Sequence, residues 1–555
     1  MIASKFLTKT TFDSYEDFIR NYYLQYPDNF NFATHVVDAY ALEEPERRAL
    51  VWCDDEGRER IFTFKDISDI SKRTAAYLRK IGIGKGDRVM MILKRRWEYW
   101  TTVVALHRIG AIAIPASFQL RDSDIAYRVN AANVKLLIAA DDDFIINQVE
   151  LARPQCPGLE KVALIRKRRD GWLEFSRGVD NTREEFTVDD TISFDDHMLI
   201  YFTSGTDGYP KMVVHPYTYP LGHIVTAGYW QCVVDGGLHF TGVDSGWAKF
   251  GWGLIYGQWL CGSAVLGYDA DNKFNPRNLI NVIRKYRPTT VCVPGTIYRF
   301  LMREGLTHED FASVRHCCTA GEPLTPAIIE DFKSITGLDI YEGYGQSESS
   351  VLVANFPWFA PRAGSMGRPS PLYNIVLQDE RGRICPPGVE GEIVVRSLQY
   401  GLPEGLIQGY FRDGQVFNAY GDSFVYHTGD LAYRDEDGYF WFVGRTDDVI
   451  KCSAYRIGPF EIESVLYKHP AVLECAITGA PDEIRGQVVK ASIVLAEGYA
   501  PSPELTKELQ DYVKQHTAPY KYPRIVDYVD SLPKTTSGKI IRKKIRLTDD
   551  EKKAY

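Results

Sequence analysis

A loop rich in serine, threonine and glycine occupies residues 201–211, with the sequence YFTSGTDGYPK. It follows an apolar run at residues 197–202, which predicts a buried strand. Glycines let backbone N–H groups approach an anion closely, and hydroxyl and ammonium groups add further donors. The pattern predicts a phosphate-binding loop, with a plain solvated turn as the alternative. The residues that we expect to contact phosphate are Thr203, Ser204, Gly205, Thr206, Gly208 and Lys211.

The spacing of this loop differs from that of a Walker A loop. Walker A reads GxxxxGK[ST], whereas this segment reads GxxGxxK, with Tyr209 and Pro210 before the lysine and Met212 after it. The difference disfavours an ordinary P-loop ATPase or kinase.

Three further segments follow in order, with the sequences EGYGQSE at 342–348, YHTGDLAYRDEDGYFWFVGRTDD at 426–448 and PKTTSGKIIR at 533–542. Together with the first loop they resemble the adenylate-forming superfamily of acyl-CoA synthetases, peptide-synthetase adenylation domains and luciferases. The resemblance covers nearly the whole chain. It is greatest to the medium-chain acyl-CoA synthetase branch, through YFTSG, EGYGQSE, YRIGPFEIE at 455–463 and YKYPR at 520–524.

The resemblance implies an α/β fold with two domains. A large N-terminal AMP-binding domain of stacked α/β subdomains is expected at 1–446, and a small mobile α+β domain at 447–555, with the hinge at Asp447. It also implies a two-step reaction. The carboxylate of an acid attacks the α-phosphorus of ATP with release of pyrophosphate, and the thiol of coenzyme A then opens the acyl-AMP anhydride.

The resemblance assigns roles to individual residues. Lys539 of SGK is expected to bridge the carboxylate and the α-phosphate, and Thr206 and Glu348 complete the catalytic set, with Glu348 holding Mg²⁺. Asp430 and Arg445 resemble the pair that holds the ribose hydroxyls, and Tyr344 offers its ring to adenine. The remaining expected ATP contacts are Gly321, Glu322, Pro323, Glu342, Gly343, Gly345, Gln346, Ser347 and Arg456.

The acyl pocket and the coenzyme A site are also expected from the resemblance. An aromatic-rich stretch at 241–259 is the predicted pocket wall, and glycine at 345 implies room for an acid longer than acetate. Medium-chain or branched aliphatic acids are expected first and aromatic acids next. The expected pocket residues are Trp247, Lys249, Trp252, Cys292 and Gly345. The expected coenzyme A contacts are Ser453, Ala454, Tyr455, Arg485, Tyr522, Pro523 and Arg524.

Two residues depart from the family pattern. Ala454 replaces the usual glycine of the pantetheine tunnel, and its methyl group narrows that path. Asp207 places an acid beside the triphosphate, where the family usually has a small neutral residue, and this weakens ATP binding unless the side chain faces solvent.

Composition agrees with an enzyme of this kind. The 555 residues carry a net charge of −8 and an isoelectric point near 5.9, which argues against nucleic acid as the main partner. No apolar run is long enough to span a bilayer, and the N-terminus has no apolar signal region. Ten scattered cysteines without a CxxC pair suit reduced thiols in a cytoplasm. The oligomeric state stays open, a homo-oligomer being one alternative.

Apolar periodicity predicts the elements that position these loops. A βαβ unit is expected from a strand at 88–93, an amphipathic helix at 96–109 and a strand at 111–116. Ligands gather beyond the carboxyl ends of strands in open α/β sheets, so the loops should converge. Further strands are expected at 134–139, 290–293, 316–319, 339–341, 473–477 and 488–495, and a helix at 503–516.

Three functions remain for comparison. The favoured function is an AMP-forming acid:CoA ligase. An adenylation enzyme that loads a carrier-protein thiol, or releases the adenylate, would not consume coenzyme A. A non-catalytic nucleotide sensor would keep the fold, but the joint presence of Lys539, Glu348, Asp430 and Arg445 counts against it.

Overall fold

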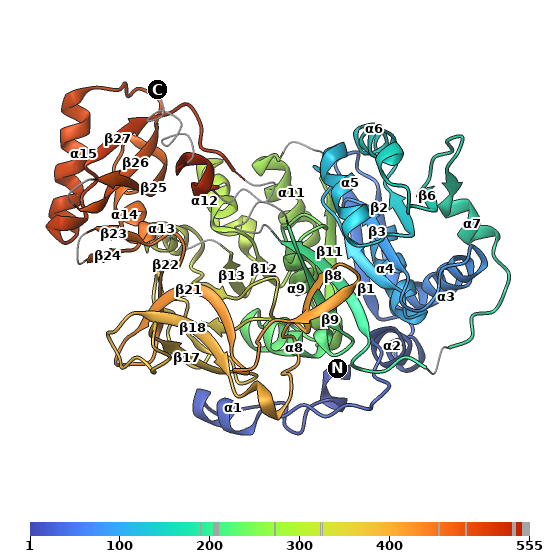
Figure 1. Ribbon diagram of the computed structural model, residues 1–555. Helices are drawn as coiled ribbons and strands as arrows, with labels where there is room; N and C mark the ends of the chain where they lie inside the picture. Colours follow the sequence, from blue (N-terminus) through green and yellow to red (C-terminus); the bar gives the residue numbers. More distant parts are fainter. Residues whose placement is uncertain are drawn as a thin grey trace.

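The computed structural model describes residues 1–188, 191–203, 210–270, 274–321, 324, 326–452, 455–482, 485–534 and 540–546. Within these residues the strands form four sheets (Figure 1). The first nine-stranded sheet runs, in spatial order, β16 (Arg368–Pro369), β15 (Val353–Ala354), β14 (Ile340–Tyr344), β13 (His316–Ala320), β12 (Thr290–Cys292), β10 (Leu238–Thr241), β11 (Ala264–Asp269), β1 (Arg48–Asp54) and β2 (Glu59–Thr63).

The second nine-stranded sheet also has parallel strands at its centre. Its order is β20 (Gln415–Asn418), β19 (Gly409–Arg412), β9 (Lys211–Pro216), β8 (His197–Thr203), β4 (Ile112–Pro115), β3 (Arg88–Ile92), β5 (Leu136–Ala139), β6 (Lys161–Leu164) and β7 (Leu173–Glu174). A small antiparallel sheet contains β17 (Asn374–Gln378), β18 (Gly391–Arg396), β21 (Tyr426–Arg434) and β22 (Phe440–Arg445).

Helices cover these sheets. They are α1 (Tyr15–Asn21), α2 (Ala39–Glu43), α3 (Phe64–Lys80), α4 (Glu98–Arg108), α5 (Asp122–Ala131), α6 (Asp143–Ala152), α7 (Phe175–Asn181), α8 (Tyr219–Ile224), α9 (Ala248–Leu254), α10 (Tyr256–Leu260), α11 (Pro276–Tyr286), α12 (Gly295–Arg303) and α13 (Pro326–Thr336). Every residue of α4 is buried. This helix connects two strands of the second sheet, yet its Trp100 packs against Gly267 of the first sheet. Helix α4 therefore lies between the two large sheets.

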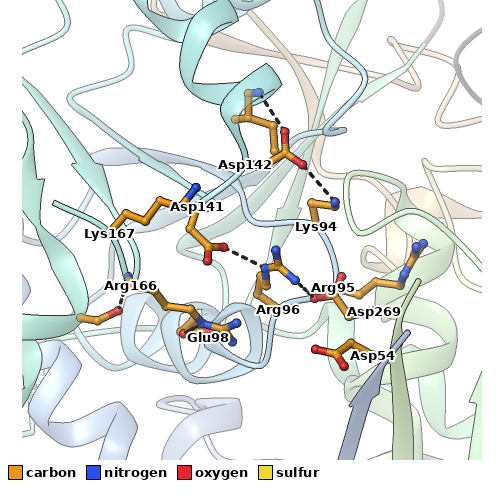
Figure 2. A network of polar contacts seen from close by, with 12 residues as sticks. Asp54, Lys94, Arg95, Arg96, Glu98, Asp141, Asp142, Arg166, Lys167 and Asp269 are labelled. Carbon is orange, nitrogen blue, oxygen red and sulfur yellow. Dashed lines mark hydrogen bonds and ion pairs between the residues drawn. The ribbon is translucent and has the colours of Figure 1, made fainter. Parts of the chain in front are cut away.

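Charged residues also connect the two large sheets (Figure 2). The Arg96 guanidinium lies between Asp141, which follows β5, and Asp269, which ends β11. The Arg96 Nε to Asp141 Oδ1 distance is 3.0 Å, and the Asp269 side chain is fully buried. Lys94, two residues earlier in the same turn, pairs with Asp142 at 3.1 Å. Ion pairs thus join the carboxyl ends of strands from both sheets.

The C-terminal part forms a sheet with its own hydrophobic core (red in Figure 1). Its strands are β24 (Tyr455–Ile457), β23 (Ile450–Cys452), β26 (Gly486–Leu495) and β25 (Val472–Asp482), with β27 (Ile525–Tyr528) parallel to β26. Helices α14 (Pro459–Leu466) and α15 (Pro503–His516) pack on it. Helix α15 starts where Ser502 accepts a hydrogen bond from the Leu505 N–H, with Pro503 at the first helical position.

The predicted α/β fold with a large N-terminal and a small C-terminal part is confirmed. The expected βαβ unit is β3, α4 and β4, and the helix expected at 503–516 is α15. The other expected strands correspond to β5, β12, β13, β14, β25 and β26. Among the described residues, no helix combines the length and apolarity that a membrane crossing requires. All ten cysteines are free in the structure.

Candidate active site

Asp430 is the centre of a polar cluster at the end of β14. Its carboxylate accepts hydrogen bonds from the Tyr344 hydroxyl and from Gln346 Nε2, both at 2.6 Å. Arg445 Nη1 lies 3.3 Å from the other carboxylate oxygen, because Asp430 and Arg445 are register partners on β21 and β22. Burial, followed by the charge of Asp430, raises the pKa of Tyr344 well above its usual value. Four residues predicted from two distant sequence segments therefore meet.

Gln346 is fixed from two further directions. Its side-chain nitrogen also donates to the Thr428 carbonyl at 2.8 Å, and its oxygen accepts from the Tyr426 hydroxyl at 2.8 Å. These contacts come from β21, the strand that carries Asp430. The segment 344–346 is consequently anchored to the small antiparallel sheet.

Glu348 is positioned by Tyr410 of β19. The Tyr410 hydroxyl donates to Glu348 Oε1 at 3.3 Å, and the Lys211 ammonium lies 5.4 Å from the centroid of the same tyrosine ring. Tyr410 pairs with Val213 across β19 and β9, which explains why it reaches the strand that begins at Lys211. One tyrosine thus contacts both the closing lysine of the first loop and the predicted metal ligand.

His215 supports the same segment from the core. Its Nε2 donates to the Ser347 carbonyl at 2.7 Å, because a carbonyl oxygen can only accept, and its side chain is fully buried. Burial lowers the pKa of His215 to about 4, so the neutral ring holds this contact. His215 and Tyr410 were missed by the sequence analysis. Each is a single ring residue on a strand, without a spacing pattern that would distinguish it from core.

The predicted metal site consists of one carboxylate in the described structure. No group of three or more His, Cys, Asp or Glu side chains within the described ranges is arranged to hold a metal. Mg²⁺ in nucleotide enzymes is commonly held by one or two carboxylates together with the phosphates. The Glu348 carboxylate, oriented by Tyr410, fits that donor set.

Glu342, one of the predicted ATP contacts, is a buried carboxyl group held by backbone hydrogen bonds. Its carboxyl oxygens accept backbone hydrogen bonds from Leu324 at 3.2 Å and from Gly364 at 2.9 Å. Burial raises the pKa of Glu342 to about 8, which these two hydrogen bonds oppose. Glu342 therefore joins β14 to the backbone of Leu324 and Gly364.

Three predicted acyl-pocket residues lie at strand ends, with Cys292 on β12, Gly345 after β14 and the Lys249 ammonium on the Ala320 carbonyl of β13. Trp247 precedes α9, which carries Lys249 and Trp252, and Cys292 ends β12 with its side chain buried. A Cβ atom on Gly345 would lie only 2.4 Å from Cη2 of Trp252. The space that glycine leaves at 345 is thus occupied by the Trp252 indole, and the expected room for a longer acid does not follow from that glycine.

The described residues among the predicted coenzyme A contacts lie on or beside the strands of the C-terminal sheet. The Arg524 guanidinium donates to the Tyr522 hydroxyl at 2.9 Å, next to buried Pro523. Arg485 follows β25, and Gly486 after it pairs with Cys452 of β23, which leads into the predicted tunnel segment. Tyr455 and Arg456 lie on β24.

Asp447, the predicted hinge, lies between β22 and β23, with its carboxylate 3.6 Å from Arg445 Nε. Several predicted positions lie outside the described residues. These are Ser204, Gly205, Thr206, Asp207, Gly208, Glu322, Pro323, Ser453, Ala454 and Lys539.

Comparison with known proteins shows the family of this chain. The family model described as AMP-binding enzyme matches residues 37–411, and that described as AMP-binding enzyme C-terminal domain matches residues 461–539. The rat (Rattus norvegicus) protein named Acyl-coenzyme A synthetase ACSM3, mitochondrial, is 38% identical over 545 residues, which cover 96% of this chain and 93% of that protein. Human (Homo sapiens) Acyl-coenzyme A synthetase ACSM4, mitochondrial, is 41% identical over 531 residues, covering 94% and 90%.

Solved structures that are similar to this chain include proteins titled as CoA ligases. The crystal structure of the anthranilate CoA ligase AuaEII in complex with anthranoyl-AMP superimposes with a TM-score of 0.84 at 26% identity, covering 96% of this chain and 99% of that chain. A benzoate CoA ligase from Burkholderia xenovorans LB400 has a TM-score of 0.81 at 25% identity, covering 93% and 100%. The chain therefore belongs to the AMP-binding enzyme family, among its acyl-coenzyme A synthetases.

Proposed function

We propose that this chain is an ATP-dependent ligase that activates a medium-chain or branched aliphatic carboxylic acid as acyl-AMP and transfers the acyl group to coenzyme A. The observation that carries the proposal is the convergence of Tyr344, Gln346 and Arg445 on the buried Asp430 carboxylate. Such a cluster offers an aromatic ring, an acceptor and a cation at the carboxyl ends of parallel strands, where open α/β sheets bind nucleotides.

The reaction proceeds in two steps. A carboxylate oxygen forms a bond to the α-phosphorus while the bond from that phosphorus to the bridging oxygen breaks, and pyrophosphate leaves with the electron pair. The sulfur of coenzyme A then bonds to the acyl carbon, AMP leaves, and the thiol proton passes to solvent. Positioning and neutralisation of charge supply most of the catalysis in the first step.

The chain's own residues have separate roles in the first step. A carboxylate accepts about four hydrogen bonds, so Asp430, oriented by its three neighbours, is suited to accept the ribose hydroxyls. Glu348 would hold Mg²⁺, which neutralises phosphate charge when it is bound. Lys211 and, from the family resemblance, Thr206 and Lys539 would contact the phosphates.

The second step is assigned to the C-terminal part. The domain boundary is proposed at Asp447. Rotation of the C-terminal part about this residue would move Lys539 away from the nucleotide and bring up the face that carries Arg485 and the 522–524 loop. Arginine suits the phosphates of coenzyme A because its planar donors match phosphate oxygens. The separate hydrophobic core of this part supports a rigid-body rotation.

The compartment is part of the proposal. Ten free cysteines, nine of them buried, support a reducing environment such as the predicted cytoplasm. The rat and human relatives are named as mitochondrial. Immunoblotting of separated cytosolic and organelle fractions decides between the two.

An aromatic acid is the second candidate substrate. Two similar structures are titled as anthranilate and benzoate CoA ligases. The Trp252 indole packs against Gly345, and an aromatic surface of this kind would suit a flat ring as well as a branched chain.

The test is the release of pyrophosphate and AMP with acids from acetate to decanoate, branched acids and benzoate, each with and without coenzyme A. AMP and acyl-CoA formed in turnover that requires coenzyme A, with a maximum beyond acetate, are the expected result. Pyrophosphate release that ignores coenzyme A would indicate a carrier-loading enzyme, and no release with any acid would indicate a nucleotide sensor.

A further inference from the structure

Strand β21 leaves its regular antiparallel ladder with β18 at residues 428–430. Glu392 pairs with Leu431, and the next register pair is Val394 with His427. Three residues of β21 therefore face a single residue of β18. Such a bulge bends the strand and redirects its side chains, and bulges are frequent beside active sites. The 428–430 bulge is thus the local structure that presents the last of its side chains to the candidate active site.

Gly429 is the central residue of this bulge. Its φ angle is +70°, which favours glycine, and a Cβ atom there would lie 3.0 Å from Arg445 Nη2. The Gly429 carbonyl accepts a hydrogen bond from the Thr446 N–H at 2.9 Å. The Arg445 guanidinium therefore packs on Gly429, next to the Asp430 carboxylate with which it pairs.

Glu392 supplies the hydrogen-bond acceptor for the Gly429 N–H. The distance from Gly429 N to Glu392 Oε1 is 2.8 Å. A bulge takes backbone groups out of the ladder, so these groups need other partners. The second oxygen of Glu392 accepts from His427 Nδ1 at 2.8 Å, because an ionised carboxylate can only accept. Two neighbouring positions of β21 thus hold one carboxylate of β18 against the bulge.

Thr428 ties the same bulge to the next residue of β18. Its hydroxyl donates to the Ile393 carbonyl at 2.7 Å and accepts from the Asp430 N–H at 3.1 Å. Glu392 and Thr428 therefore act on the backbone beside Asp430 rather than on its carboxylate. The direction of that carboxylate depends on the shape of the bulge.

We propose that Glu392 is a positioning residue for the nucleotide. By accepting from the Gly429 N–H, it holds the 428–430 bulge in the shape that presents the Asp430 carboxylate to the ribose. The inference rests on the proposed function, in which Asp430 accepts the ribose hydroxyls. Because these contacts exist already in the ground state, the loss of Glu392 should appear in nucleotide affinity and in the KM for ATP rather than in kcat.

The experiment compares Glu392→Asp with Glu392→Gln, which separate the position of the acceptor from its charge. Aspartate keeps the charge but withdraws the oxygen from Gly429 by one methylene group. Glutamine loses the charge but keeps an oxygen that can accept from the same N–H. Glu380→Asp is the matched control, because Glu380 is an exposed glutamate between β17 and β18.

Two measurements are made on each protein. Calorimetric titration gives the affinities for AMP and for dideoxy-AMP, which lacks both ribose hydroxyls. The ratio of the two affinities reports the contacts to these hydroxyls and needs no turnover. Acid-dependent ATP–pyrophosphate exchange gives separate KM values for ATP and for the acid. Thermal midpoints show that each variant is folded.

The wild type is expected to prefer AMP to dideoxy-AMP on the order of 10- to 100-fold. Glu392→Asp should reduce this preference at least about fivefold and raise the KM for ATP by a similar factor, with the KM for the acid near wild type. Glu392→Gln and Glu380→Asp should retain the preference.

An unchanged preference in Glu392→Asp, or equal losses in Glu392→Asp and Glu392→Gln, would overturn the inference alone. Equal affinities of the wild type for the two nucleotides would overturn the ribose role of Asp430 and the inference with it. A wild type that activates no acid would overturn the proposed ligase function. In that event a loss of the preference in Glu392→Asp would still support the inference.

Discussion

Gly345 and Trp252, both predicted to line the acyl pocket, pack directly against each other. Cη2 and Cζ2 of Trp252 lie 2.4 Å and 3.1 Å from the position that a Cβ on residue 345 would take, and the Ser350 carbonyl lies 2.7 Å away. Neither residue can therefore be understood alone. The absence of a side chain at 345 leaves the room that the indole occupies.

Gly345→Ala should impair both stability and activity, because overpacking typically costs about 1–3 kcal/mol. Trp252→Phe removes the second ring and should shift the preferred acid toward longer chains. In the double variant the loss of stability caused by alanine should be only partly relieved, because the close contact with the Ser350 carbonyl remains. A double-mutant cycle on thermal midpoint and on the chain-length profile measures this coupling. Strict additivity of the two changes would contradict the steric pairing.

Tyr410 offers a second prediction at the scale of single residues. Tyr410→Phe removes the hydroxyl that donates to Glu348 but keeps the ring under Lys211. Weaker apparent binding of Mg²⁺ in the first half-reaction is expected, together with unchanged acyl-CoA formation from supplied acyl-AMP. Calorimetric titration of ATP with and without Mg²⁺ provides a readout independent of turnover. Tyr433→Phe, on β21, serves as the matched control.

Glu342 predicts a pH dependence of stability. Burial raises its folded pKa to about 8, whereas an unfolded glutamate keeps the ordinary value of 4.5. Between these values the folded protein binds one more proton than the unfolded chain, so stability falls as pH rises, by at most about 1.4 kcal/mol per unit. Above the folded pKa this contribution stops changing.

Glu342→Gln should flatten that dependence, because the amide cannot ionise. Thermal midpoints at about pH 5.5 and about pH 7.5 should differ less in the variant than in the wild type. Equal differences in the two proteins would show that the carboxyl ionises freely in the folded state.

At the scale of elements, apolar periodicity was a sound guide wherever a segment has one buried face. Helix α15 has its apolar residues Leu505, Leu509 and Val513 at helical spacing, and its bounds were predicted to the residue. The predicted helix at 96–109 was too long at its start, because α4 begins at Glu98. The turn before it directs the side chains of Lys94 and Arg96 into buried ion pairs. Periodicity contains no information about which charged residues a tertiary contact will bury.

The same limit applies to the site. Asp430 and Arg445 were predictable because they belong to recognisable segments, and the register of β21 and β22 makes them partners. The tie from Tyr410 to Glu348 and the packing of Trp252 on Gly345 join segments that lie more than fifty residues apart. Only the assembled sheets bring such pairs together.

The Arg96 link predicts how the two large sheets hold together. Arg96→Met leaves the Asp269 carboxylate buried without its cation, and breaking a buried pair costs about 3–5 kcal/mol. A lower urea midpoint is expected. Arg168→Met, whose side chain is 75% exposed, should change stability by at most about 1 kcal/mol. Equal midpoints for the two variants would show that packing of α4, not this ion pair, joins the sheets.

At the scale of the whole molecule, the C-terminal part is held by charges close to the predicted hinge. Asp448 pairs with Arg546 at 2.9 Å and with Arg542 at 3.7 Å, and Arg542 also binds Glu463 of α14 through both carboxylate oxygens. These partners all belong to the C-terminal part, so they can move with it. The Asp447 carboxylate, one residue earlier, pairs instead with Arg445 of the N-terminal part, while its backbone carbonyl accepts from Arg546 Nη1 at 3.5 Å. The change of partner between two adjacent residues supports a rotation axis at this point.

Asp447→Pro should therefore separate the two half-reactions. Proline fixes φ near −65° and restricts the preceding residue, while the N–H groups of Thr446 and Asp448, which donate to Gly429 and Arg445, remain in place. Adenylation should stay within a few fold of wild type, whereas acyl-CoA formation from supplied acyl-AMP should fall at least about 10-fold, because it needs the rotated arrangement. Asp447→Ala removes the same carboxylate without restricting the backbone and should leave both half-reactions nearly intact. If proline slowed adenylation and thioester formation equally, residue 447 would be a structural loop position, and the rotation axis would have to lie elsewhere between β22 and β23.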